Sequence, residues 1–172
     1  NVANLMGESI VSRGPDDSGV WKSQALPLAF SFRRLSIQDL SDAGSQPMHS
    51  NSGRYVICFN GEIYNHLELR SALSANIKWK GHSDTETVLA VIEAYGIQKA
   101  LTMFIGMFAF SIFDKKKETI VLAIDRLGEK PLYFGWTDKA FVFGSELKAL
   151  KKYPGFHNKI SKKALSNFLR YS

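Results

Sequence analysis

The stretch GRYVICFNGEIYN, residues 53–65, decides the fold that we expect for this chain. Its residues 55–59 are apolar on both alternating faces, which predicts a strand that is buried from both sides. Asn60 and Gly61 follow, and both residue types tolerate the backbone conformations of a sharp turn. We therefore expect the strand to end there, with an amide side chain and a backbone N–H pointing the same way. Two such donors are what an oxyanion hole requires, although an ordinary turn has the same sequence.

The residues around this strand predict further strands and several helices. A helix-cap residue followed three positions later by Glu occurs at Asn65 and at Ser83, and the second helix is expected to end at Gly96. Hydrophobic periodicity and turn residues predict a helix over 1–11, a loop over 13–19, strands over 20–21 and 27–32, hairpins of 106–114 with 119–125 and of 132–135 with 140–143, and helices over 146–151 and from Ser161. Buried strands with helices between them indicate stacked sheets covered by helices, an α+β fold.

Length and composition predict a soluble globular protein of one domain. The chain has 172 residues, of which 45% are hydrophobic and 22% charged. No apolar run reaches the ~20 residues of a membrane-spanning helix, and no signal peptide is visible. The single cysteine excludes an internal disulfide and fits a reducing compartment. We therefore expect a cytoplasmic protein with no membrane partner.

The net charge of +6 raises the question of nucleic-acid binding. The positive charges are scattered, and the basic run 115–117 falls at the tip of an expected hairpin. Aromatic and basic residues do not alternate as they do where bases stack on a protein. None of the histidines has the spacing of metal ligands. We expect neither a nucleic-acid partner nor a metal site.

A series of short motifs occurs in a fixed order along the chain. They are SRGPDDSG (12–19), FRRLSI (32–37), QPM (46–48), FNGEIYN (59–65), GHSDTE (81–86), GMFAF (106–110), DRLGEKPLYFG (125–135) and SELKAL (145–150). From Ser12 to its end the chain thereby resembles the class II glutamine amidotransferase domain of the glutamine-hydrolysing asparagine synthetase family. The resemblance implies an αββα four-layer sandwich of the N-terminal-nucleophile hydrolase type, here lacking its first strand.

The resemblance also implies roles for individual residues. Asn60 and Gly61 match the donors of the oxyanion hole, which are the catalytic residues that we expect in this chain. Arg34 matches the arginine that binds the α-carboxylate of glutamine, for which a planar guanidinium is suited; otherwise it is a surface arginine. Asp84 matches the residue that receives the α-ammonium group, and it also suits a helix N-terminus. The expected substrate-binding set is Arg34, Leu35, Ile37, Asn60, Gly61, Glu62 and Asp84.

The nucleophile implied by the resemblance is an N-terminal cysteine, whose own α-amino group acts as the base. Residue 1 is Asn1, and the single thiol, Cys58, falls inside the central predicted strand, where we expect a buried hydrophobic side chain. We therefore expect that the chain begins inside a longer protein and that it is inactive on its own. Ser12 and Phe32 stand where relatives usually carry His or another polar residue, with effects that the sequence does not define.

The resemblance implies a two-part protein. Residues 1–153 would be the glutaminase domain, and residues 154–172 would begin the connection to a missing ATP-dependent synthetase domain of the same polypeptide. Glutamine would be hydrolysed to glutamate, and the ammonia would be used to amidate aspartate, a ligase reaction of asparagine biosynthesis. ATP and Mg²⁺ are expected in the missing domain and no cofactor in this one; a homodimer is possible. Two alternatives stay open: another acceptor, such as a sugar acid in surface-polysaccharide synthesis, and a binding or structural relative that lacks the nucleophile.

Overall fold

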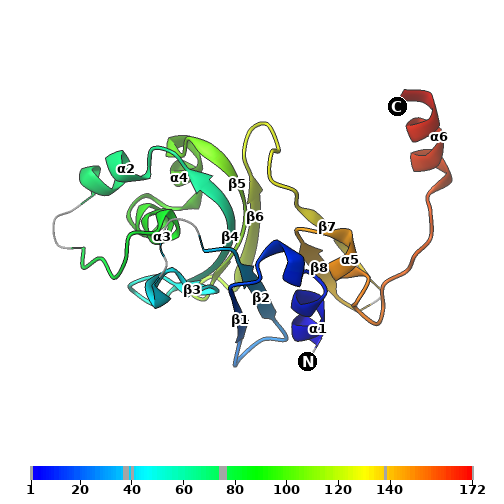
Figure 1. The fold of residues 1–172 in the computed structure, drawn as a ribbon, viewed down its shortest axis with the longest axis horizontal. Coiled ribbons are helices and arrows are strands. Elements are labelled where there is room, and N and C mark those ends of the chain that lie inside the picture. Colours follow the sequence, from blue (N-terminus) through cyan, green and yellow to red (C-terminus); the bar gives the residue numbers. More distant parts are fainter. Residues whose placement is uncertain (1, 37–38, 40, 74–76, 138, 172) are drawn as a thin grey trace.

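An antiparallel four-stranded sheet lies at the centre of the molecule (Figure 1). The computed structural model describes residues 2–36, 39, 41–73, 77–137 and 139–171. The strand order in the sheet is β3-β4-β5-β6, formed by β3 (Met48–His49), β4 (Tyr55–Ile63), β5 (Gly106–Asp114) and β6 (Thr119–Ile124). The predicted central strand is therefore confirmed as β4, and the hairpin of β5 with β6 is confirmed as well.

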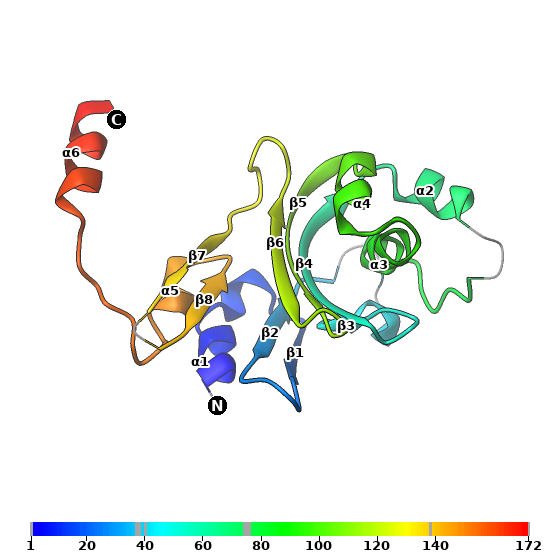
Figure 2. The same ribbon diagram turned by 180° about the vertical axis from the view of Figure 1, so that it is seen from behind.

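Helices cover one face of this sheet, and two hairpins cover the other (Figures 1 and 2). The helices are α2 (His66–Ala72), α3 (Asp84–Tyr95) and α4 (Ile97–Met103). The hairpins are β1 (Asp17–Lys22) with β2 (Ala29–Arg34), and β7 (Tyr133–Trp136) with β8 (Phe141–Gly144). Helices α1 (Val2–Glu8) and α5 (Leu147–Leu150) lie beyond the hairpins. The molecule is thus α+β with antiparallel sheets, and its layers are consistent with the expected sandwich.

The two faces of β4 explain why its residues are apolar throughout. Ile57, Phe59 and Ile63 point into the larger core cluster with the buried face of α3 and with Phe108 and Phe110 of β5. Val56 points the other way, into a smaller cluster with Phe30 and Phe113. A strand buried from both sides has no polar face, which is what the sequence of residues 55–59 predicts.

The predicted end of this strand at Asn60 and Gly61 is wrong. β4 continues to Ile63 and pairs with β5 along its whole length, including Gly61 with Phe108. Gly61 has φ +156°, and a Cβ on it would lie 2.2 Å from the carbonyl oxygen of Met107. The glycine therefore serves a close approach of two strands rather than a turn.

The helix caps are only partly as predicted. Ser83 caps α3 by accepting a hydrogen bond from the N–H of Glu86 at 3.3 Å, and α3 ends before Gly96. Asn65 precedes α2, but its side chain makes no cap hydrogen bond. It donates instead to the carbonyl of Met103 and accepts from the N–H of Ile105, both at 3.0 Å. Asn65 therefore joins α2 to the end of α4.

Other element boundaries shift by a few residues from those predicted. β1 begins at Asp17, inside the predicted loop, and β2 extends through Arg34. Helix α4 was not predicted. Short 3-10 helices occupy Val11–Arg13 and Asp42–Gly44. The last helix, α6 (Lys162–Tyr171), stands apart from the rest of the chain in both views (Figures 1 and 2), and none of its residues is buried.

Within the described residues, none of the helices has both the length and the apolar character needed to cross a bilayer.

Candidate functional site

A cavity of about 430 Å³ lies between β2, β4 and the N-terminus of α3. Its lining includes almost the whole predicted substrate-binding set: Arg34, Leu35, Asn60, Gly61, Glu62 and Asp84. Ile37, the remaining member, lies outside the described residues. Residues separated by up to 50 positions in the sequence are thus brought to one hollow. The roles that the resemblance implies for them remain predictions.

Asp84 is the first residue of α3 and is only 5% exposed. Its Oδ2 accepts a hydrogen bond of 2.9 Å from the backbone N–H of Ile63, so the helix is tied to the far end of β4. Burial raises the pKa of the Asp84 carboxyl, although the Ile63 N–H acts in the opposite direction. Burial of an ionised carboxylate costs free energy unless it is paired with a cation, and the ammonium group of a substrate would be such a cation.

Arg34 ends β2 and is 8% exposed. Its Nη1 donates to the carbonyl of Ser41 at 3.1 Å, and its Nη2 donates to the carbonyl of Asp39. Nη1 also lies 4.0 Å from a carboxylate oxygen of Asp17. Gly44 allows this arrangement, because a Cβ there would lie 2.2 Å from Nη2. The two carbonyls fix the plane of the guanidinium but accept only two of its five N–H groups.

One edge of β4 faces the cavity with a row of backbone N–H groups. Because hydrogen bonds of a strand alternate between its two edges, residues 55, 59, 61 and 63 face the same way. Tyr55 donates to Ser50 Oγ at 3.1 Å, Phe59 to Gln46 Oε1 at 2.7 Å and Ile63 to Asp84 Oδ2 at 2.9 Å. The N–H of Gly61 therefore points toward the cavity, between the groups that hold Phe59 and Ile63.

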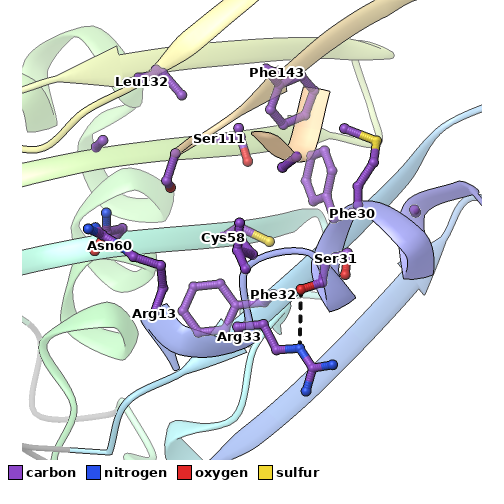
Figure 3. A pocket seen from close by; sticks show the side chains of 18 of the residues that line it. Arg13, Phe30, Ser31, Phe32, Arg33, Cys58, Asn60, Ser111, Leu132 and Phe143 are labelled. Carbon is purple, nitrogen blue, oxygen red and sulfur yellow. Dashed lines mark hydrogen bonds between the residues drawn. The ribbon is translucent and has the colours of Figure 1, made fainter. Parts of the chain in front are cut away.

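Asn60 lines both this cavity and a second, mainly apolar cavity of about 140 Å³. Figure 3 shows side chains that line the second cavity, Asn60 among them. The second cavity is enclosed by α1, β2, β4, β5 and β8. Both cavities share Arg13, Phe32, Arg33, Phe59 and Asn60 in their linings. By alternation along β4, the side chain of Asn60 lies on the same face as Cys58. The amide of Asn60 is therefore presented at the junction of the two cavities.

Cys58 lines the second cavity and packs against the cluster of Phe30, Val56 and Phe113 (Figure 3). Burial raises the pKa of the Cys58 thiol, and a hydrogen bond with Ser111 acts weakly against it. The thiolate is the reactive form of cysteine, and these surroundings disfavour it. Cys58 is only partly buried, because it lines a cavity, so the prediction of a fully buried side chain is wrong. Its apolar surroundings agree with the prediction of an unreactive cysteine.

The structure adds residues that the sequence did not single out. Arg13 ends the first 3-10 helix and lines both cavities, with its Nε 3.5 Å from Glu146 Oε1. Lys130 lines the first cavity, in a loop held by the buried carboxylate of Asp125, which accepts the Lys130 N–H at 3.3 Å. Both belong to quoted motifs, but only the folded chain brings them to the site. Ser12 and Phe32 also line the first cavity.

Comparison with known proteins gives a consistent result. A family model described as "Glutamine amidotransferase domain" matches residues 1–172. The chain is 41% identical over 146 residues to asparagine synthetase [glutamine-hydrolyzing] 1 and 40% identical over 149 residues to asparagine synthetase [glutamine-hydrolyzing] 2, both of Bacillus subtilis. It is 39% identical over 139 residues to asparagine synthetase B [glutamine-hydrolyzing] of Escherichia coli. These matches cover 84%, 87% and 80% of the chain, but only 22%, 19% and 24% of the respective relatives.

Proposed function

Because the chain belongs to the glutamine amidotransferase domain family, we propose that it is the glutaminase domain of an asparagine-synthetase-like enzyme. The observation that carries this proposal is the cavity of about 430 Å³, which is lined by a buried arginine, a buried aspartate and the Asn60–Gly61 segment of β4. Opposite charges at one end and amide donors at another suit a zwitterionic amino acid with a side-chain amide.

Glutamine binding follows from the charges in the cavity. The Arg34 N–H groups that do not donate to the carbonyls of Asp39 and Ser41 would bind the α-carboxylate. Asp84 would accept the α-ammonium group, with Glu62 beside it in the lining. The side-chain amide would then lie toward β4, where Gly61 N–H and the Asn60 amide could donate to its oxygen. As a nucleophile attacks, negative charge develops on that oxygen and these two hydrogen bonds become stronger.

The nucleophile in our proposal is a cysteine on a strand that precedes Asn1 in the complete protein. Three observations support a place for such a strand. Among the described strands, β2 and β8 each pair with a single neighbour. Both line the second cavity, whose walls are mainly apolar. This cavity meets the first one at Asn60, so the end of a strand lying there would reach the amide of a bound glutamine. The strand would complete a sandwich of the N-terminal-nucleophile hydrolase type.

The first reaction would form a thioester. The cysteine sulfur would bond to the amide carbon of glutamine, and ammonia would leave with a proton returned by the α-amino group. Water would then cleave the thioester to give glutamate and the free thiol. Every step uses groups at the junction of the two cavities, with Asn60 and Gly61 holding the oxyanion in both halves.

The acceptor reaction belongs to a second part of the protein. The chain spans between 19% and 31% of the length of the curated relatives that it matches. In our proposal residues 1–153 form the glutaminase domain and residues 154–172 lead to a synthetase domain, where ATP and Mg²⁺ would activate aspartate for amidation. Ammonia released at the junction of the cavities would be the shared intermediate.

The test is nitrogen transfer by the complete protein. With glutamine labelled with ¹⁵N in its amide, together with aspartate, ATP and Mg²⁺, we expect glutamate and ¹⁵N-labelled asparagine in equal amounts. The 172-residue chain alone should release no glutamate. A complete protein without glutamine hydrolysis would refute the proposed function. Turnover by the chain alone that disappears in Cys58→Ser would refute our placement of the nucleophile.

A further inference from the structure

Gln46 lies where the ladder between β3 and β4 would continue, and its side chain takes the place of a strand. The pairs Met48 with Ile57 and His49 with Val56 fix the register. Two positions further, the same register sets Gln46 opposite Phe59. Pro47 lies between and has no N–H to donate. The backbone ladder ends at Met48, but the backbone of Phe59 at this edge of β4 is still hydrogen-bonded, by the side chain of Gln46.

The side-chain amide of Gln46 makes both hydrogen bonds that a neighbouring strand would make to Phe59. The Phe59 N–H donates to Oε1 at 2.7 Å, and Nε2 donates to the Phe59 carbonyl at 3.2 Å. This pair of bonds is the motif of a hydrogen-bonded position in an antiparallel ladder. These two bonds fix the backbone of Phe59, the residue immediately before Asn60, which is the proposed oxyanion donor.

The same amide reaches the helix that carries Asp84. Nε2 lies 3.4 Å from Oγ1 of Thr85, the residue after Asp84, and Thr85 is 3% exposed. Four residues further along β4, Asp84 accepts the N–H of Ile63. The strand and the helix are thus joined on both sides of Gly61, by Gln46 at Phe59 and by Asp84 at Ile63.

We propose that Gln46 is a positioning residue for glutamine hydrolysis, which fixes the Asn60–Gly61 donors of β4 relative to the α3 terminus that binds the substrate. This inference rests on the proposed function of the cavity. Gln46 lines the cavity but acts through Phe59 and Thr85. Its loss should weaken the alignment of the donors with the developing oxyanion more than the binding of the charged ends of glutamine.

The experiment compares variants of the complete protein. Gln46→Met keeps a similar volume and removes both hydrogen bonds to Phe59. Outright loss of one oxyanion donor costs about 10²- to 10³-fold in kcat, so misplacement should lower kcat for glutamine hydrolysis by about 10- to 100-fold. The KM for glutamine should change by less than about threefold, and synthesis with free ammonia should be retained. Gln98→Met, the same change at an exposed position of α4, is the matched control and should match the wild type.

Gln46→Glu tests the donor separately and covers the case in which Gln46→Met does not fold. Its carboxylate still accepts from Phe59 but cannot donate, whereas the protonated acid can do both. The ratio of its kcat to that of the wild type should therefore rise as the pH is lowered. The charged side chains that share the cavity lining with Gln46 are those of Arg13, Arg33, Arg34, Asp39, Glu62, Asp84 and Lys130. They are present in both proteins, so their contribution to the pH profile largely cancels in the ratio.

Three results would overturn the inference. One is an unchanged kcat in folded Gln46→Met, and another is a pH-independent kcat ratio for Gln46→Glu. The third is an equal loss with glutamine and with ammonia, which would indicate a general structural role. The assay of the wild-type protein separates these failures from a failure of the proposed function. If the wild-type protein does not hydrolyse glutamine, the proposed function itself is refuted.

Discussion

Arg34 and Asp84 are charged side chains that the fold keeps almost entirely out of water, at 8% and 5% exposure. Desolvation of an ion costs several kcal/mol in proteins. Arg34 is compensated by two backbone carbonyls. Asp84 has the backbone N–H groups of Ile63 and Thr85 and the helix terminus, and a terminus contributes only about 0.3–1 kcal/mol. The raised pKa of Asp84 indicates that its compensation is incomplete.

The incomplete compensation predicts opposite effects of Asp84→Asn on stability and on binding. A raised carboxyl pKa lowers stability above the unfolded value near 3.8, so the neutral amide should raise the melting temperature at pH 7. Loss of the charge should also raise the KM for glutamine by about 10- to 100-fold, since hydrogen bonds to charged groups contribute about 1.5–3 kcal/mol. Thermal melting and glutaminase kinetics on one preparation check both. A lower melting temperature with an unchanged KM would mean that Asp84 is purely structural.

Asn60 is expected to act mainly in the transition state. Asn60→Gly keeps the backbone freedom of this position and removes the amide, so kcat for glutamine hydrolysis should fall about 10²- to 10³-fold. The KM should change far less, because the contact strengthens as charge develops. Steady-state kinetics in the complete protein are the measurement. A variant with unchanged kcat would end the oxyanion assignment of Asn60.

At the scale of elements, the loop between β2 and the second 3-10 helix holds Arg34 in place. The carboxylate of Asp39 accepts the N–H of Ser41 at 2.9 Å, the Ser41 hydroxyl at 2.6 Å and the N–H of His82 at 2.8 Å. These bonds, that of the Ser41 hydroxyl first, lower the pKa of Asp39 to about 2. The loop is thus tied to the segment before α3, while its carbonyls at Asp39 and Ser41 hold the guanidinium.

The low pKa of Asp39 predicts a loss of stability in acid. A carboxyl whose folded pKa is lowered stabilises the protein above the unfolded value of 3.8, and this contribution is lost as the pH falls toward about 2. The free energy of unfolding, measured with urea between pH 5 and pH 2, should therefore decrease less steeply in Asp39→Asn than in the wild type. An equal slope in both proteins would contradict the role given to this carboxylate.

The observed helices and strands can be compared with those that the sequence predicts. The buried strand, the hairpins and the Ser83 cap follow from local patterns, and the structure has each of them. The prediction of a turn at Asn60 and Gly61 is wrong, because β4 pairs with β5 through these residues. β5 begins over 40 residues later in the chain, so a local turn signal could not reveal this pairing. The Asn65 side chain likewise bonds to residues after α4 instead of capping α2. The proposed positioning role of Gln46 could not be predicted from the sequence, because it depends on the register between β3 and β4.

At the scale of the whole molecule, the four-stranded sheet separates two functions. Its helix-covered face carries most of the buried core. The apolar cavity lies on the other face, and the cavity that it meets at Asn60 lies at the edge of β4 beside the N-terminus of α3. Residues of the latter cavity come from seven of the eight quoted motifs. The resemblance could therefore single out members of this lining, although no local pattern could place them together. In our proposal the acceptor site lies in a different part of the complete protein, so the glutamine site is independent of it.

If the cavity of about 430 Å³ binds glutamine, loss of this binding should affect synthesis by the complete protein from glutamine but not from ammonia. In Arg34→Ala, glutamine-dependent synthesis should lose about 100-fold in kcat/KM, the effect of a lost charge-assisted contact of 2–3 kcal/mol, mostly through a higher KM. Synthesis from free ammonia, which bypasses the cavity, should stay at the wild-type rate. An equal loss with both nitrogen donors, or no loss with glutamine, would contradict the account.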